Sequence, residues 1–257
     1  MSKFIEKLQR IWRNEPQPMG FALSRSASEK PRIQLIAQIN AADVETITAS
    51  LSSADAVIVN IAKSDDVGAL EKLCQSKDGP PAGGWIKVTN NGALKKLLNL
   101  ECDFAVFSTS SQLTVTQKEK LGRILEIDAS LSEGLLRTCN DLPVDAVLTA
   151  DKVGESLNIS RLMQIQHLLY FINKPILVAI SNDLGTPDLQ ALWDAGVSGV
   201  IIEIEDEKSA EKLVELRKTL EKLTPSTSRK KARTSAILPR LQAETPPPEE
   251  GEEEEDE

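Results

Sequence analysis

The chain has 257 residues, 40% hydrophobic and 27% charged, which is enough apolar material for one large domain or two small ones with a buried core. Its formal net charge is −9, but eight acids fall within residues 249–257, so the rest of the chain lacks the basic excess that nucleic-acid binding requires. A single histidine and three widely spaced cysteines exclude most serine-hydrolase, histidine-base and zinc-site mechanisms and any disulfide framework.

The first 14 residues have the pattern of an amphipathic helix, with basic side chains around one face. The other face is apolar and consists of Phe4, Ile5, Leu8, Ile11 and Trp12. We expect this helix to plug one end of the domain that follows or to form a subunit contact; a membrane-surface helix is the less favoured alternative. No apolar run approaches the ~18 residues that span a bilayer, and the start lacks a secretory signal pattern. The expected location is therefore the cytoplasm.

Residues 31–224 repeat one unit, in which a β-branched run is followed by a polar junction and a segment of helical periodicity. The run occurs eight times, at Ile33–Ile39, Ala56–Ile61, Gly84–Val88, Phe104–Ser108, Arg123–Asp128, Asp145–Ala150, Pro175–Ile180 and Gly199–Ile204. Eight strand–helix units predict a (β/α)8 TIM barrel, whereas a doubly wound sheet more often has five or six strands. The predicted domains are residues 1–30 (helix and linker), 31–224 (TIM barrel) and 225–257 (tail).

The tail predicted for residues 225–257 is rich in proline and acidic residues and is expected to be disordered. Within it, "AILPRL" at residues 236–241 lies between a basic cluster and the acidic run. A charged tail of this kind usually keeps a protein soluble. The apolar hexamer leaves a docking peptide as the alternative.

Alternation along the strands predicts which polar side chains reach the mouth at the carboxyl ends of the barrel strands. The predicted set is Gln34, Gln38, Asn40, Asn60, Lys87, Thr89, Ser108, Glu126, Asp128, Thr149, Asp151, Ser181, Glu203 and Glu205. Five of these are carboxylates, and their placement under the helices would bury charge. A site with oxygen ligands and no histidine favours Mg²⁺ or Mn²⁺. The alternative to a metal site is that these carboxylates form a solvated acidic rim with one structural Lys–Glu pair.

Several segments resemble one known family. They are "GGWIKVTNNGALKKLLNLECDFAVFSTS" from Gly83, "RILEIDASLSEGLLRTCNDLPVDAVLTAD" from Arg123 and "KPILVAISNDLGTPDLQALWDAGVSGVIIEIED" from Lys174. These segments are similar to the HpcH/HpaI-type aldolase and citrate lyase beta-subunit family. The resemblance implies a divalent metal that polarises a pyruvate-type oxo acid, with Glu126 as the first metal ligand and Asp151 as the second. Lys87 stands where the family has an enolate-binding arginine.

Two function hypotheses follow. The first is a lyase that acts on a small oxo acid, in which Glu126 and Asp151 hold Mg²⁺ or Mn²⁺, Lys87 stabilises the enolate, and Glu203 or Lys152 transfers protons. The second is a non-catalytic barrel that binds a protein partner or serves as a scaffold, with a homo-oligomer among the assemblies considered.

Two further expectations concern single residues. A Schiff-base aldolase that uses Lys87 or Lys152 ranks last, because nearby carboxylates favour the ammonium form over the amine that this chemistry needs. His167 lies in an apolar helix and is expected to be packed rather than catalytic.

Overall fold

The computed structural model describes residues 2–13, 33–47, 50–76, 79–86, 96–97, 99–112 and 120–224. The linker and the predicted disordered tail, residues 225–257, lie outside these ranges. A first compact unit covers Met1–Pro225 and contains the barrel. Within the described ranges, no helix combines the length and the apolar character needed to cross a membrane.

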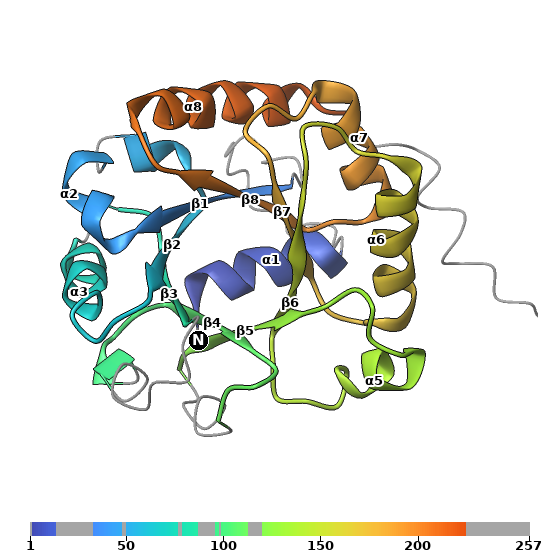
Figure 1. Cartoon of the computed structure of the whole chain (residues 1–257), viewed down its shortest axis with the longest axis horizontal. Helices are drawn as coiled ribbons and strands as arrows, with labels where there is room; N and C mark the ends of the chain where they lie inside the picture. Colours follow the sequence, from blue (N-terminus) through green and yellow to red (C-terminus); the bar gives the residue numbers. More distant parts are fainter. Residues whose placement is uncertain are drawn as a thin grey trace, which may run out of the picture. The chain divides into compact units, whose positions relative to one another are not determined.

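Eight parallel strands close into a barrel, in which each strand pairs with the next along the chain and the last pairs with the first (Figure 1). The strands are β1 (Gln34–Asn40), β2 (Ala56–Ile61), β3 (Ala82–Ile86), β4 (Phe104–Ser108), β5 (Gly122–Ile127), β6 (Ala146–Val153), β7 (Ile176–Ile180) and β8 (Gly199–Ile204). All eight predicted strands are present, so the predicted TIM barrel is confirmed.

Helices surround the barrel and follow most of the strands (Figure 1). They are α2 (Val44–Ile47), α3 (Val67–Gln75), α5 (Glu133–Thr138), α6 (Ile159–Phe171), α7 (Thr186–Ala195) and α8 (Glu207–Lys222), with the short 3-10 turns η1 (Ala41–Asp43) and η2 (Ser50–Ser53). Local sequence sets their ends. Asn158 caps α6 by accepting the Arg161 backbone N–H at 2.8 Å, and Gly196 ends α7 at a φ of 120°, which glycine adopts without strain.

Alternation along the strands divides the apolar core into two parts. One part fills the lumen and includes Ile36, Ile58, Trp85, Val106, Ile124, Leu148, Leu177 and Ile201. The other lies between the strands and the helices and includes Leu35, Val59, Leu125, Val147, Val178 and Ile202. The lumen is therefore a packed core rather than a channel, and its polar side chains are confined to the ends of the strands.

The amino end of the barrel is filled by α1 (Lys3–Arg13), which lies within the ring of strands in Figure 1. Phe4, Ile5 and Leu8 are buried in the lumen core, and the Phe4 and Phe104 rings pack with centroids 4.9 Å apart. The predicted plug is thus present. Gly122, the first residue of β5, provides room for it, because a Cβ there would lie 2.6 Å from Ile5 Cγ1.

Aspartates immediately before even-numbered strands fasten the same end of the barrel. The carboxylate of Asp55 accepts the Leu35 N–H at 3.0 Å, and that of Asp145 accepts the Arg123 N–H at 2.8 Å. Asp103, which precedes β4, instead caps α1, because its carboxylate accepts the N–H groups of Lys3 and Phe4 at 2.8 and 3.0 Å. These carboxylates thus satisfy backbone N–H groups, two of which belong to the first turn of α1 and have no acceptor within the helix.

Candidate functional site

Polar side chains gather at the carboxyl ends of the strands, which is where TIM barrels build their sites. The lumen-facing positions there carry Gln38, Asn40, Asn60, Ser108, Glu126, Lys152 and Glu203. On β7 the position two residues after the lumen residue Leu177 is Ala179, which has a small apolar side chain. Composition therefore changes along the lumen, from an apolar amino end to a polar mouth.

Three side-chain amides form a hydrogen-bonded chain along β1 and β2. Gln38 Nε2 donates to Asn60 Oδ1 at 3.2 Å, and Asn60 Nδ2 donates to Asn40 Oδ1 at 2.9 Å. The chain continues at 3.5 Å to Asp43 Oδ2. Each amide fixes the orientation of the next, so this wall of the mouth presents donors and acceptors in defined positions.

Glu126 lies on the lumen side of β5, as predicted. Trp85 Nε1 donates to Glu126 Oε2 at 3.1 Å, and the tryptophan ring belongs to the buried lumen core. Sequence reasoning missed Trp85 because it counted the residue as apolar. Its indole N–H was the available signal, since a buried indole needs an acceptor.

Lys152 and Glu203 form an ion pair on one side of the mouth, with Nζ and Oε2 3.4 Å apart. The lysine comes from β6 and the glutamate from β8, so the pair bridges the end of β7, which lies between these strands. The Lys152 side chain is 47% exposed and that of Glu203 34% exposed. A pair this open to water contributes at most about 1 kcal/mol to stability, so either partner can be exchanged for a ligand at little cost.

The prediction that Thr149 and Asp151 face the lumen is wrong. Val147 and Val153 belong to the outer core, and the side chains between them on the same parity face α6. There the Asp151 carboxylate pairs with Arg161 at 3.3 Å, and the Arg161 guanidinium also contacts the Thr149 hydroxyl at 3.5 Å. The buried arginine supplies the charge partner that makes this outward placement stable.

The five predicted acids do not form one cluster. Asp128 is in a local turn, where hydrogen bonds from the backbone N–H and side chain of Ser130 lower the pKa of its carboxyl below the usual value. Glu205 is exposed beyond the end of β8. The described residues contain no group of three or more histidine, cysteine, aspartate or glutamate side chains able to hold a metal. Lys87 and Thr89 lie outside the described residues.

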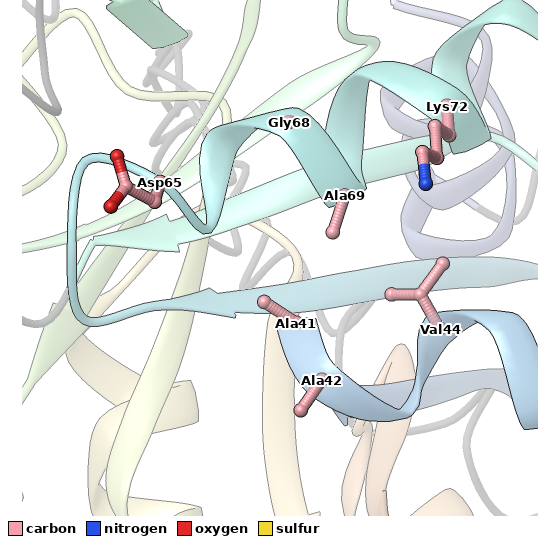
Figure 2. A pocket seen from close by; sticks show the side chains of 7 residues that line it. All are labelled: Ala41, Ala42, Val44, Asp65, Gly68, Ala69 and Lys72. Atoms are coloured by element: carbon pink, nitrogen blue, oxygen red, sulfur yellow. The ribbon is translucent and has the colours of Figure 1, made fainter.

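An open groove of about 360 Å³ lies outside the barrel, between η1 and α2 on one side and α3 on the other (Figure 2). Its lining consists of Ala41, Ala42, Val44, Asp65, Gly68, Ala69 and Lys72. Figure 2 shows Asp65 and Lys72 near opposite ends, with the small side chains between them. The groove therefore brings few polar groups together, and the mouth is the better equipped of the two places.

Comparison with known proteins supports the TIM-barrel fold but no particular family or activity. No protein-family model matches the chain, and no curated protein sequence matches it. Among solved structures, tryptophan synthase from Mycobacterium tuberculosis has a TM-score of 0.60 at 12% identity, over 86% of this chain and 97% of that one. A second similar structure is 3-keto-L-gulonate-6-phosphate decarboxylase from Vibrio cholerae, with a TM-score of 0.55 at 12% identity over 74% of this chain and 99% of that one. A third is thiamine phosphate pyrophosphorylase from Pyrococcus furiosus, with a TM-score of 0.54 at 13% identity over 74% of this chain and 96% of that one.

These neighbours are TIM-barrel enzymes, and at such identities the likeness concerns the fold alone. The resemblance to the HpcH/HpaI-type family is therefore supported only as far as the TIM-barrel fold.

Proposed function

We propose that the mouth of this barrel binds a small oxo acid, with Lys152 as its cationic anchor. The supporting observation is the Lys152–Glu203 pair, whose Nζ and Oε2 atoms are 3.4 Å apart and which bridges the end of β7. A ligand carboxylate takes the place of Glu203 on the Lys152 ammonium. Charge-assisted hydrogen bonds of this type are among the stronger polar contacts in proteins.

The amide chain lies next to this pair, because Gln38 on β1 is the register partner of Glu203 on β8, and it provides the second half of the proposed site. Gln38 and Asn60 are held by each other, so a carbonyl or hydroxyl group of the ligand meets donors and acceptors that need no rearrangement. Displacement from Lys152 leaves the Glu203 carboxylate free to accept a proton from the bound acid. Proton abstraction next to a carbonyl group is the chemistry that such an arrangement supports.

A metal-dependent carbon–carbon lyase is the second candidate, and it rests on Glu126. This carboxylate stays in the lumen because Trp85 holds it, in agreement with the ligand role implied by the family resemblance. The proposed partner Asp151 pairs with Arg161 instead, so the two acids do not form the expected Mg²⁺ or Mn²⁺ site. No step is therefore assigned to a metal, and the proposed enolate contact of Lys87 belongs to this second candidate.

Phosphorylated ligands, which occur in the names of two of the neighbours, fit the mouth less well. TIM barrels often bind phosphate at the loops after the seventh and eighth strands, next to a helix N-terminus. Here the loop after β7 carries Asp183, and Asp206 occupies the N-terminus of α8 by accepting the Ser209 N–H at 2.8 Å. The Asp206 carboxylate therefore repels a phosphate at this helix start, although Asp183 is paired with Lys212.

Calorimetric titration with pyruvate and with oxalate, each with and without Mg²⁺, tests the proposal. We expect metal-independent binding that Lys152→Met weakens at least about tenfold, because the ligand loses one charge-assisted hydrogen bond of roughly 1.5–3 kcal/mol. The matched control is Lys218→Met, which removes an exposed lysine from α8 and should leave the affinity unchanged.

Three other outcomes are informative. Binding that requires Mg²⁺, survives Lys152→Met and disappears in Glu126→Gln would favour the lyase. Equal losses in both lysine variants would show that the effect is one of net charge only. Absence of binding by either acid, with and without metal, would refute both candidates and favour a scaffold role.

A further inference from the structure

In the part of the chain that the structure describes, the exposed large apolar side chains lie on α5, on the loop after it and on α6. They are Leu135, Leu142, Ile159, Met163 and Tyr170. Figure 1 shows α5 and α6 on the same side of the barrel, and Asn140 joins them by donating to the Phe171 carbonyl oxygen at 2.9 Å. We refer to the five side chains as the α6 patch.

The area of the α6 patch is large for a monomer. Ile159 and Tyr170 are each 79% exposed and Met163 is 63% exposed. The five side chains together expose on the order of 600 Å² of surface. The largest apolar patch on a typical monomer covers about 300–600 Å², so this area is at the upper end of that range. A standard interface buries about 800 Å² per partner, so the patch with a narrow polar rim is sufficient for a stable contact.

The outer face of α6 also lacks charge. Between Ile159 and Phe171, Arg161 carries the only formal charge, and it is buried against Thr149 and Asp151. By contrast, the 16 residues of α8 carry charged side chains on most of their exposed positions. A contact through α8 would remove many charged side chains from water, whereas the outer face of α6 can pack against its own copy without this cost.

The order of side chains on this face is symmetric. Ile159, Met163, Gln166 and Tyr170 are all exposed, and their spacing of four, three and four residues places them in one stripe about 16 Å long. The spacing reads the same in both directions. Two antiparallel copies of α6 related by a twofold axis therefore bring Ile159 opposite Tyr170 of the second copy, and Met163 opposite Gln166 of the second copy.

We propose that the α6 patch is the interface of a symmetric homodimer, in which α6 packs antiparallel against α6 of a second copy of this chain. The contact is isologous, so one surface serves both subunits and the assembly closes at two copies. The aromatic ring of Tyr170 and the aliphatic side chains of Ile159 and Met163 form its apolar centre. The interface lies on the outside of the barrel and is independent of the proposed ligand at the mouth.

Sedimentation equilibrium of the full-length protein tests the dimer. We expect the wild type to sediment as a dimer at micromolar concentration, and Met163→Glu to raise the dimer Kd by about 30-fold or more, as for a central interface residue. Gln75→Glu is the matched control, because it adds the same charge at an exposed position on α3 and should leave the Kd unchanged. Far-ultraviolet circular dichroism verifies that both variants are folded.

Cross-linking tests the antiparallel geometry. An equimolar mixture of Ile159→Cys and Tyr170→Cys should form a disulfide-linked dimer on mild oxidation, whereas the wild type and each variant alone should form little. A wild type that stays monomeric at all concentrations would overturn the proposal. So would a dimer whose Kd Met163→Glu leaves unchanged, or a monomer that binds phosphatidylcholine vesicles through the patch.

Discussion

Gly122 offers a direct test of how tightly α1 fills the amino end of the barrel. A Cβ at this position would lie 2.6 Å from Ile5 Cγ1, 2.8 Å from Ser2 Oγ and 2.9 Å from Phe104 Cβ. These separations are shorter than van der Waals contact, so α1 or the strand must shift. Overpacking of this kind costs about 1–3 kcal/mol. We therefore expect Gly122→Ala to lower Tm by about 2–12 °C in scanning calorimetry of a chain of this size.

Gly134 provides the matched control for this substitution. It lies in α5, and a Cβ there meets no atom within 4 Å. Alanine is favoured over glycine inside a helix by roughly 0.5–1 kcal/mol. Gly134→Ala should therefore leave Tm unchanged or raise it by a few degrees.

A double-mutant cycle identifies α1 as the partner in the clash. Ile5→Ala removes the nearest atom and by itself should cost about 2–5 kcal/mol, because it leaves a cavity in the lumen core. In combination with Gly122→Ala, the total cost should be smaller than the sum of the single costs by about 0.5–3 kcal/mol. Additive costs, or a Gly122→Ala variant with unchanged Tm, would refute the described packing of α1.

Three further substitutions or measurements test other parts of the structure. Asp103→Ala removes the acceptor of the first N–H groups of α1, so urea denaturation should show a loss of about 0.5–2 kcal/mol, and full retention would contradict the cap. Burial raises the pKa of Cys74 to about 12, so iodoacetamide at about pH 8 should alkylate it roughly a thousandfold more slowly than in urea-unfolded protein; equal rates would show an accessible thiolate. Hydrogen bonds from the Ser209 hydroxyl and backbone N–H lower the pKa of Asp206, so its support of α8 is present above the usual aspartate pKa of about 3.9 and is lost as pH falls through the lowered value. Circular dichroism between about pH 4 and about pH 2 should show a smaller acid-induced change in Asp206→Asn than in the wild type.

The fold was predictable because the pattern of a parallel barrel repeats along the chain. A strand buried on both faces is a nearly continuous apolar run, as in Ala56–Ile61 and Ile176–Ile180, and such runs differ clearly from the charged helices between them. The amino-terminal helix was predictable for the same reason, since its apolar face repeats at helical spacing. Its partners were not predictable, because Asp103 and Gly122 lie about 100 residues away along the chain.

The prediction for the mouth holds for Gln38, Asn60, Glu126 and Glu203 and is wrong on β6, whereas the residues predicted on β3, Lys87 and Thr89, lie outside the described residues. The prediction placed Thr149 and Asp151 in the lumen on the argument that an acid under a helix is costly. That argument fails here because Arg161, ten residues beyond Asp151, is itself buried and pairs with the acid. Such a pairing depends on how the helix packs on the strand, and the sequence of an apolar helix with one arginine does not reveal it. Because side chains alternate along β6, the outward placement of Thr149 and Asp151 directs Lys152 into the mouth, where it pairs with Glu203.

His167 shows the same dependence on packing. It was expected to be packed within an apolar helix, and its ring does contact Phe171 edge to face at 4.8 Å between centroids. The side chain is nevertheless exposed, because the apolar positions of α6 exceed what the barrel covers. The outward face of this helix carries Ile159, Met163 and Tyr170 in addition to polar residues, so periodicity alone does not identify the face that packs on the strands.

The two ends of the barrel differ in how their residues contribute to stability. At the amino end, Phe4, Leu8 and Phe104 are fully buried, and each such side chain adds roughly 1.5–3 kcal/mol through burial. At the mouth, the Lys152–Glu203 pair is open to water and adds at most about 1 kcal/mol. Because the fold is stabilised away from the mouth, its polar residues can change partners when a ligand enters without loosening the barrel. Lys152→Met and Glu203→Gln therefore report on binding with little interference from unfolding.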